Sequence, residues 1–348
     1  MPLRAQVDGI SVNAALLSDA EWQALKASRS LRMPCCDTRG YQRTSRLGIR
    51  HFVHSPGSHC GAEGESSEHL AAKAEIVRAC HEVGWDVQSE FAGDKWRADV
   101  YATRGRHRVA FEVQWSPQTL EQTRERQVAY GADVKCCWLF RRVPLPSGQR
   151  YDPYASKPSA DSTLPMFRLS LTDSGFTVEV DYHRVSLREF VQARLAGRIR
   201  FCEKRHYTAR EVQLTIFKEN CPRHSAFHAF YTTEVLQSHC GALIETDVRG
   251  GLHFQSDPHN ALRSYHLVGK IFANELKSLR VSVKRRWSKT VRRSYWCFGC
   301  PECSWFLGDH FFFQKMGEEG TTLCSEQIPH SEKFAEPHWC FPQNGRFC

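Results

Sequence analysis

Apolar and polar residues alternate along residues 96–116, WRADVYATRGRHRVAFEVQWS, on both sides of a basic turn. Side chains of a β-strand point alternately to its two faces, so this pattern predicts the two strands of a hairpin. The apolar face of the second strand is formed by Val109, Phe111 and Val113. Glu112 and Gln114 lie on its other face, and pairing of the strands brings Asp99 beside Glu112. Such polar groups are costly to bury without a partner.

Helix and strand patterns alternate around this hairpin. Residues 66–84 have the spacing of a helix that Ser67 can cap and Gly84 can end. DVQSEF and VKCCWLFR predict two further strands, and SPQTLEQTRERQVAYGA predicts a second helix. The resulting order is helix, three strands, helix, strand. It indicates an α/β core whose last strand runs parallel through a helical crossover.

The flanking segments predict smaller elements. A strand pair is expected over residues 5–15, and a capping box of Ser18 and Glu21 begins a helix at LSDAEW. Later in the chain GFTVEVDYH predicts a strand and VSLREFVQARLAG a helix. EVQLTIFKENCPRHSAFHAFYTTEV predicts two strands around a tight turn, and SYWCFGCPECSWFLGDHFFF repeats that shape.

Changes in composition along the chain suggest its domains. Residues 144–165 are rich in Pro, Ser and Asp, which is typical of a linker. We therefore expect an N-terminal Cys/His module over residues 1–62, the α/β core over 63–143 and a C-terminal domain over 166–348.

Composition narrows the class of protein. The 348 residues are 41% apolar and 24% charged, as in an ordinary soluble globular protein. No segment has the length and apolarity of a membrane helix, and Asp8 interrupts any signal-peptide core. We expect a cytoplasmic protein without a membrane partner. Its formal net charge of +9 permits a polyanionic partner.

The paired carboxylates indicate a metal site. Asp99 and Glu112 repel each other unless a cation lies between them, and Mg²⁺ is commonly held by one or two carboxylates. Glu68 adds a third acid at the start of the preceding helix. Two alternatives remain open. Glu68 can be a solvated acid favoured by the helix dipole, and Asp99 can cap the hairpin with Arg97 as its salt partner.

The chain resembles a known family in several short motifs taken together. They are HFVH at 51–54, EHLAAK at 68–73, RADV at 97–100, EVQWS at 112–116, RERQVAY with Arg126 and Tyr130, and Trp138 in CCWLF. Their order resembles the PD-(D/E)XK nuclease core, and their wording resembles more closely the competence protein CoiA-like family. The resemblance covers roughly residues 30–142, and the C-terminal cysteine region loosely.

This resemblance implies a metal-dependent nuclease fold linked to DNA processing, with a mixed sheet flanked by helices. It assigns Asp99 and Glu112 to a catalytic Mg²⁺ or Mn²⁺, with Glu68 and Gln114 completing the catalytic set. Gln114 stands where the general nuclease motif has Lys. Glutamine can hydrogen-bond a water but cannot supply charge or act as a base, so activation of the water would depend on the metal.

Cysteine and histidine spacing predicts two structural zinc sites. Cys221–His224 and Cys300–Cys303 each lie at the tip of a predicted hairpin, and two such knuckles make a four-ligand site, with Cys297 as an alternative ligand. A second site would combine Cys35, Cys36, His54 and Cys60, although adjacent cysteines are poorly spaced for it. His51 can instead be a packed histidine. We expect the remaining cysteines considered, Cys80, Cys136, Cys137 and Cys202, to pack as small apolar residues.

A basic stretch near the C-terminus is a candidate nucleic-acid surface. It holds Lys284, Arg285, Arg286, Lys289, Arg292 and Arg293 around Trp287, without an acid. Basic residues with an interleaved aromatic suit phosphate contacts and base stacking, although a solvated basic face is the commoner explanation.

These patterns favour a CoiA-like, metal-dependent nuclease that binds DNA, with protein partners unspecified. A protein that keeps the fold but only binds DNA or assists recombination is the alternative. A zinc-stabilised scaffold for protein partners is a third possibility, but it leaves Asp99 and Glu112 unexplained.

Overall fold

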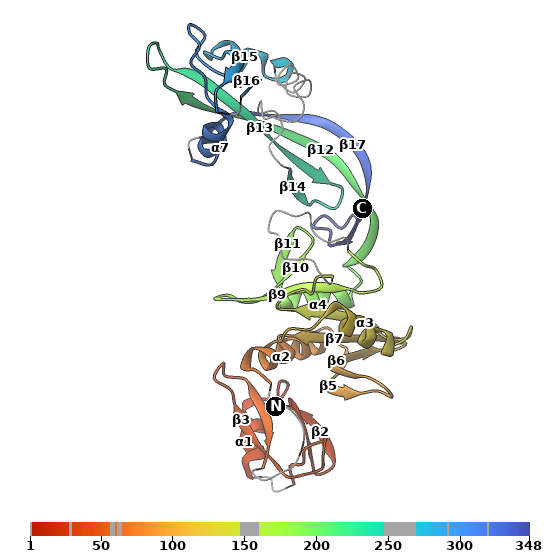
Figure 1. Ribbon diagram of the computed structural model, residues 1–348. Coiled ribbons are helices and arrows are strands. Elements are labelled where there is room, and N and C mark those ends of the chain that lie inside the picture. The colour runs from red at the N-terminus through yellow and green to blue at the C-terminus, as the bar shows by residue number, and fades with distance from the viewer. Residues whose placement is uncertain are drawn as a thin grey trace. The chain divides into compact units, whose positions relative to one another are not determined.

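The computed structural model describes residues 2–27, 30–55, 60, 65–146, 160–246, 269–290, 292–318 and 320–348 (Figure 1). The chain forms two compact units. Unit 1 comprises residues 1–204 and 335–347, and unit 2 comprises residues 205–334 and Cys348. Among the helices of the described ranges, none is both long enough and apolar enough to cross a membrane.

Unit 1 begins with a small module whose elements are β1 (Arg4–Val7), β2 (Ile10–Asn13), α1 (Asp19–Ala24), a 3-10 turn (Leu25–Ala27), β3 (Gly40–Thr44) and β4 (Arg50–His54). β1 pairs with β2, and β3 pairs with β4, both antiparallel. The predicted capping box of Ser18 and Glu21 is confirmed at the start of α1. It turns Trp22 inward, where its ring packs 5.6 Å from that of Phe52.

A seven-stranded mixed sheet forms the centre of unit 1, in the order β11-β10-β9-β8-β7-β6-β5. Its strands are β5 (Asp86–Ala92), β6 (Arg97–Arg104), β7 (His107–Gln114), β8 (Lys135–Phe140), β9 (Met166–Thr172), β10 (Gly175–Val180) and β11 (His183–Ser186). β5, β6 and β7 are antiparallel neighbours. β8 lies parallel to β7 after the crossover helix α3 (Leu120–Ala129), as predicted.

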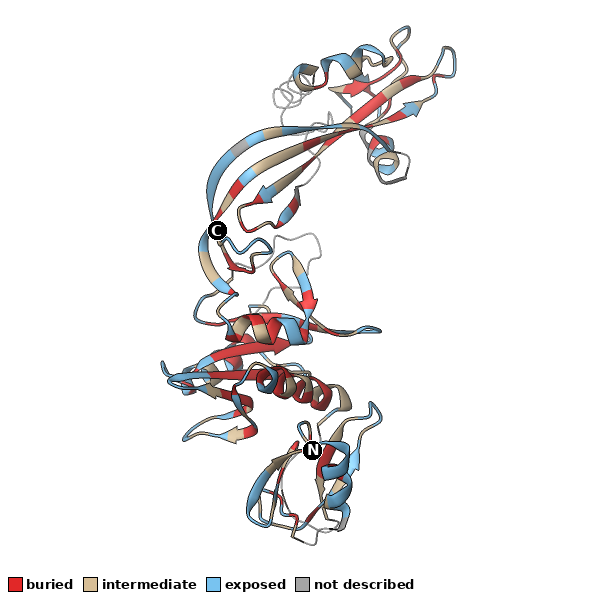
Figure 2. Ribbon diagram, turned by 180° about the vertical axis from the view of Figure 1, so that it is seen from behind, coloured by how far each residue is buried: buried red, intermediate tan, exposed pale blue. Residues whose placement is uncertain are grey.

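Helices cover both faces of this sheet, which confirms the α/β class. α2 (Ser67–Glu82) and α4 (Leu187–Leu195) share one buried cluster with strand residues such as Phe111. α3 closes the other face, where Tyr130 packs near Trp138. Figure 2 shows the buried residues concentrated on the central strands and on α2. The cap of α2 is Ser66, one residue before the predicted Ser67, because its side chain accepts from the His69 N–H.

The sheet reaches beyond the segment that the sequence assigns to the core. β9, β10 and β11 were expected in a C-terminal domain over 166–348, but they extend the same sheet through a parallel contact between β8 and β9. Trp339 and Phe341, far along the chain, are buried in the same core. Within the expected linker, residues 147–159 lie outside the described residues.

Unit 2 is built on long antiparallel strands. Its sheet has the order β14-β13-β12-β17, with β12 (Arg200–Glu219), β13 (Phe227–Ser238), β14 (Leu243–Thr246) and β17 (Thr321–Cys340). A separate hairpin pairs β15 (Val283–Ser288) with β16 (Arg293–Phe298), and the helices are α6 (Ala273–Lys277) and α7 (Asp309–Glu318). A strand was expected after the second knuckle. A single bridge between Gly299 and Phe306 forms instead, followed by α7.

Candidate functional site

Asp99 lies where the alternation of β6 is broken. Ala98 packs in the cluster under α3, whereas Val100 packs in the cluster that contains α2. The Asp99 side chain between them makes its contacts with α2 and β7. Its Oδ2 accepts from the Val113 N–H at 2.9 Å and lies 3.2 Å from His69 Nε2. Burial would raise the pKa of Asp99, but the His69 hydrogen bond and the nearby Lys73 charge hold it at about 2.

Two residues at the start of α2 complete a group around Asp99. Glu65 precedes the cap and His69 lies in the first turn. One ligand atom from each of Glu65, His69 and Asp99 lies within 4.8 Å of the others, so the three side chains can hold a metal ion. Sequence analysis missed both Glu65 and His69. The available signal was their proximity to the expected Glu68 on a helix that faces the hairpin.

A buried lysine organises the carboxylates of this group. Lys73 is fully buried, and its Nζ lies 2.7 Å from Glu65 Oε1 and 2.5 Å from Glu90 Oε1. Burial would lower the pKa of Lys73, but the charges of Glu90, Asp99 and Glu65 raise it above its usual range. Lys73 therefore remains charged and fixes Glu65 and Glu90 in place.

Glu112 has a different set of partners from Asp99. Its Oε2 accepts from Arg126 at 2.7 Å, and its Oε1 accepts from the Tyr130 hydroxyl. Burial, and then the charge of Asp99, raise the pKa of Glu112 to about 8, against the opposing effect of Arg126. The cation beside Glu112 in this structure is thus an arginine of α3, where the sequence suggested a metal shared with Asp99.

Comparison with known families supports the pattern of motifs found in the sequence. Residues 65–151 match the family model described as competence protein CoiA, nuclease-like domain. This segment is similar to the nuclease-like domain of competence protein CoiA. The match confirms the expected family and covers about a quarter of the chain. No curated protein and no solved structure matches the chain.

Gln114 and Glu68 lie outside the group formed around Asp99 in the CoiA nuclease-like domain. Gln114 donates to the Ser116 carbonyl at 3.2 Å and accepts from Arg126 at 3.4 Å. It therefore shares Arg126 with Glu112, as expected for two residues on one strand face. Glu68 forms an ion pair with Arg46 of the N-terminal module. The catalytic roles predicted for Glu68, Glu112 and Gln114 stay predictions.

The two knuckles of unit 2 come together as the sequence predicted. One ligand atom from each of the four residues Cys221, His224, Cys300 and Cys303 lies within 4.8 Å of the others. The sulfur atoms of Cys221 and Cys303 are 3.6 Å apart, and His224 Nδ1 is 3.5 Å from the Cys300 sulfur. Such a Cys₃His group can bind a metal such as zinc. Cys297 contacts the Lys284 carbonyl instead and is not in the group.

Backbone amides support the cysteines of the second knuckle. The Glu302 N–H donates to the Cys300 sulfur, and the Trp305 N–H donates to the Cys303 sulfur, both at 3.4 Å. A donor aimed at sulfur stabilises the thiolate, which is the form that binds metal. Burial opposes ionisation of Cys221, but the Arg223 backbone and the neighbouring His224 lower its pKa to about 6.

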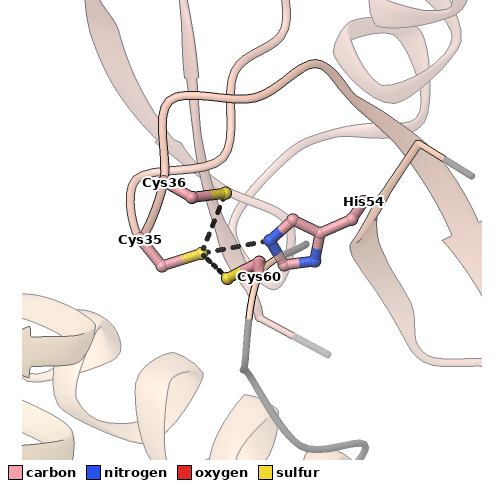
Figure 3. A group of neighbouring side chains, drawn as sticks. All are labelled: Cys35, Cys36, His54 and Cys60. Carbon is pink, nitrogen blue, oxygen red and sulfur yellow. Dashed lines mark hydrogen bonds between the residues drawn. The ribbon is translucent and has the colours of Figure 1, made fainter. Parts of the chain in front are cut away.

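The irregular cysteines of the N-terminal module also converge (Figure 3). Cys35 Sγ lies 3.1 Å from His54 Nε2, 3.6 Å from Cys60 Sγ and 3.8 Å from Cys36 Sγ. The four ligand atoms lie within 4.8 Å of one another, so this group too can bind a metal. His51 is not part of it. It is buried and contacts the Ile49 carbonyl, as a packed histidine does.

Three of the cysteines expected to pack as apolar residues, Cys80, Cys136 and Cys137, are buried in unit 1, and Cys202 is half-buried. Burial raises the pKa of the Cys137 thiol to about 12, so this thiol stays protonated.

The basic stretch divides into two sets of side chains on the hairpin β15–β16. Arg286 donates to the carbonyls of Cys303 and Cys300 at 2.8 and 2.9 Å, and Lys284 donates to the Pro301 carbonyl at 3.2 Å. These two side chains hold the second knuckle. The other basic and aromatic side chains considered in this stretch are exposed to solvent, namely Arg285, Trp287, Lys289, Arg292 and Arg293.

Proposed function

We propose that the CoiA nuclease-like domain is a metal-dependent nuclease that cleaves DNA with Mg²⁺ or Mn²⁺. The observation that carries this proposal is the ionised, partly exposed Asp99 in the domain that matches the nuclease-like family. A carboxylate with a pKa of about 2 is available to a cation at every physiological pH.

The residues around Asp99 suit this chemistry. The Val113 N–H and the buried Lys73 orient and charge-stabilise the acids that a cation would contact. A divalent ion held there would lower the pKa of a bound water and offset charge on the phosphoryl oxygens. Gln114 bonds Arg126 and Ser116 on the other face, so it is not placed to act on that water.

DNA would be held in part by the exposed set on the hairpin of unit 2. Arg285 and Lys289 supply charge for phosphates, and Trp287, with 59% of its surface exposed, supplies a stacking face. Arg286 and Lys284 would act indirectly, because their side chains hold the knuckle.

The test is cleavage of single- and double-stranded DNA by purified protein with Mg²⁺, with Mn²⁺ and with a chelator. Asp99→Asn should abolish cleavage, because it removes the charge while nearly preserving the shape. Asp94→Asn, an exposed aspartate in the preceding turn, is the matched control and should leave the rate unchanged. Absence of cleavage by the wild-type protein with either metal would contradict the proposal.

A non-catalytic DNA-binding protein is the second candidate. It is favoured by Glu112, whose carboxylate is bonded to Arg126 and Tyr130, and by Gln114 in the place of a lysine. Measuring DNA affinity beside cleavage separates the two functions, because a protein that only binds DNA keeps wild-type affinity in the Asp99→Asn form and cleaves no DNA in any form.

A further inference from the structure

The imidazole of His69 lies next to the Asp99 carboxylate, and a nitrogen ligand at this place affects which metal ion the group prefers. His69 Nε2 lies 3.2 Å from Asp99 Oδ2, and both side chains are 19% exposed. Two ligands of one octahedral ion, each about 2.1 Å from it, lie roughly 3 Å apart. The spacing of this pair therefore matches that of neighbouring ligands on a single metal ion.

The charges around the group leave room for a dication. Glu65, Glu90 and Asp99 surround one ammonium group, that of Lys73. Three carboxylates and one ammonium carry two excess negative charges, which a single divalent cation neutralises. Lys73 is fully buried and bonded to Glu65 and Glu90, so its charge is already committed.

We infer that Glu65, His69 and Asp99 form a divalent metal site that binds Mn²⁺ in preference to Mg²⁺. The inference rests on the proposed function for its place in catalysis, and it adds the class of metal and two ligands, Glu65 and His69, to Asp99. Mg²⁺ takes oxygen ligands and gives up water reluctantly. A nitrogen ligand favours the transition metals, whose affinity for such sites rises from Mn²⁺ along the series. His69 is then the residue that determines which cation is bound.

The test measures binding of the metal alone to the full-length protein. Its cysteine groups are first loaded with zinc, and zinc held by oxygen and nitrogen ligands is then removed with a mild chelator, because Zn²⁺ outcompetes Mn²⁺ at such sites. Free Mn²⁺ has a sharp electron paramagnetic resonance spectrum that is lost on binding, and Mg²⁺ is titrated as a competitor. We expect Mn²⁺ to bind about 10-fold or more tightly than Mg²⁺. His69→Asn should weaken Mn²⁺ binding about 10-fold or more and Mg²⁺ binding by less than about 3-fold.

Two further variants keep the result interpretable. His81→Asn changes an exposed histidine in the last turn of the same helix and should leave both affinities unchanged. Glu65→Gln changes a ligand just before the helix and should weaken the binding of Mn²⁺ and of Mg²⁺ alike. If His69→Asn proves unfolded by circular dichroism, Glu65→Gln decides the matter, and an unchanged Mn²⁺ affinity in that protein overturns the inference.

The outcomes also separate this inference from the proposed function. Equal Mn²⁺ and Mg²⁺ affinities, or a preference that survives His69→Asn, would make His69 only the ion-pair partner of Asp99 and overturn the inference. DNA cleavage with Mg²⁺ by that variant would leave the proposed function standing. Selective Mn²⁺ binding that depends on His69, without DNA cleavage, would support the inference and refute the nuclease activity.

Discussion

At the residue scale, the two acidic residues that the sequence pairs have opposite protonation behaviour. Asp99 receives hydrogen bonds and faces a lysine charge, so its pKa lies at about 2. Glu112 is more deeply buried and lies beside the negative charge of Asp99, so its pKa lies at about 8. Adjacent strand positions therefore supply one carboxylate that is always ionised and one that changes charge near neutral pH.

Glu112 should make the stability of unit 1 fall as the pH rises. An unfolded glutamate ionises near pH 4.3, whereas folded Glu112 keeps its proton up to about pH 8. Its contribution is fully present below pH 4.3 and is lost as the pH rises through about 8. Glu112→Gln should remove this decline. Between pH 5 and 8 the free energy of unfolding should therefore fall by on the order of 3 kcal/mol less in the variant than in the wild type.

The measurement is the free energy of unfolding in urea at several pH values from 5 to 8. The groups that face Glu112 are Arg126 of α3, Tyr130 directly after α3, Cys136 of β8 and Asp99 of β6. Asp99 gives the opposite trend at lower pH, because its depressed pKa adds stability that is lost below about pH 4. Parallel wild-type and variant profiles from pH 5 to 8 would show that Glu112 is ionised throughout.

At the element scale, the elements that local patterns determine were predicted, whereas the contacts that depend on a break in a pattern were not. The alternation of β7, the helical crossover to β8 and the capping box of α1 follow from local chemistry, and the structure has them. The site at Asp99 depends on a break in the alternation of β6, which no period-2 pattern contains. The sequence did not predict the roles of His69 and Glu65. They reach Asp99 through tertiary contact between the start of α2 and β6, and no regular spacing along the chain indicates that contact.

The second knuckle should contribute to the stability of unit 2 through zinc. Cys300→Ser is expected to remove about one zinc ion per protein and to lower the resistance of unit 2 to denaturant, since metal binding adds to the folding free energy. The control is Cys297→Ser on the adjacent strand, whose sulfur contacts a carbonyl outside the group. Mass spectrometry measures the zinc content, and denaturation curves measure the stability. A Cys300→Ser protein that equals the wild type in both would contradict the assignment.

The exposed residues of the hairpin β15–β16 should govern DNA affinity without sequence preference. Replacing Arg285 and Lys289 with Ala should weaken binding about equally across sequences and reduce the salt slope by about 2, since each phosphate contact contributes roughly 0.9. An equivalent pair of exposed lysines, Lys26 and Lys204, provides the control. Fluorescence anisotropy at several salt concentrations measures the slope. An unchanged slope would identify the hairpin as an ordinary solvated surface.

At the scale of the whole molecule, changes in composition along the chain did not predict where the two units begin and end. The four cysteine and histidine residues that the two knuckles of unit 2 bring together were predicted despite a separation of some 80 residues, because a C-x₂-C or C-x₂-H pair is a local signature. No local sequence motif predicts that Trp339 belongs to the core of unit 1. Its ring packs 5.7 Å from that of Phe167 and under the Arg194 guanidinium at 5.1 Å.

The position of Trp339 and Phe341 has a consequence for how the protein is made. Unit 1 is complete in sequence up to Lys204 except for the segment 335–347, which is synthesised roughly 135 residues later. At about 5–20 residues per second, the ribosome delivers that segment about 7 to 27 seconds after Lys204. During this interval the nascent nuclease-like unit exposes the apolar surface that Trp339 and Phe341 later cover, and transiently exposed surface of this kind favours aggregation.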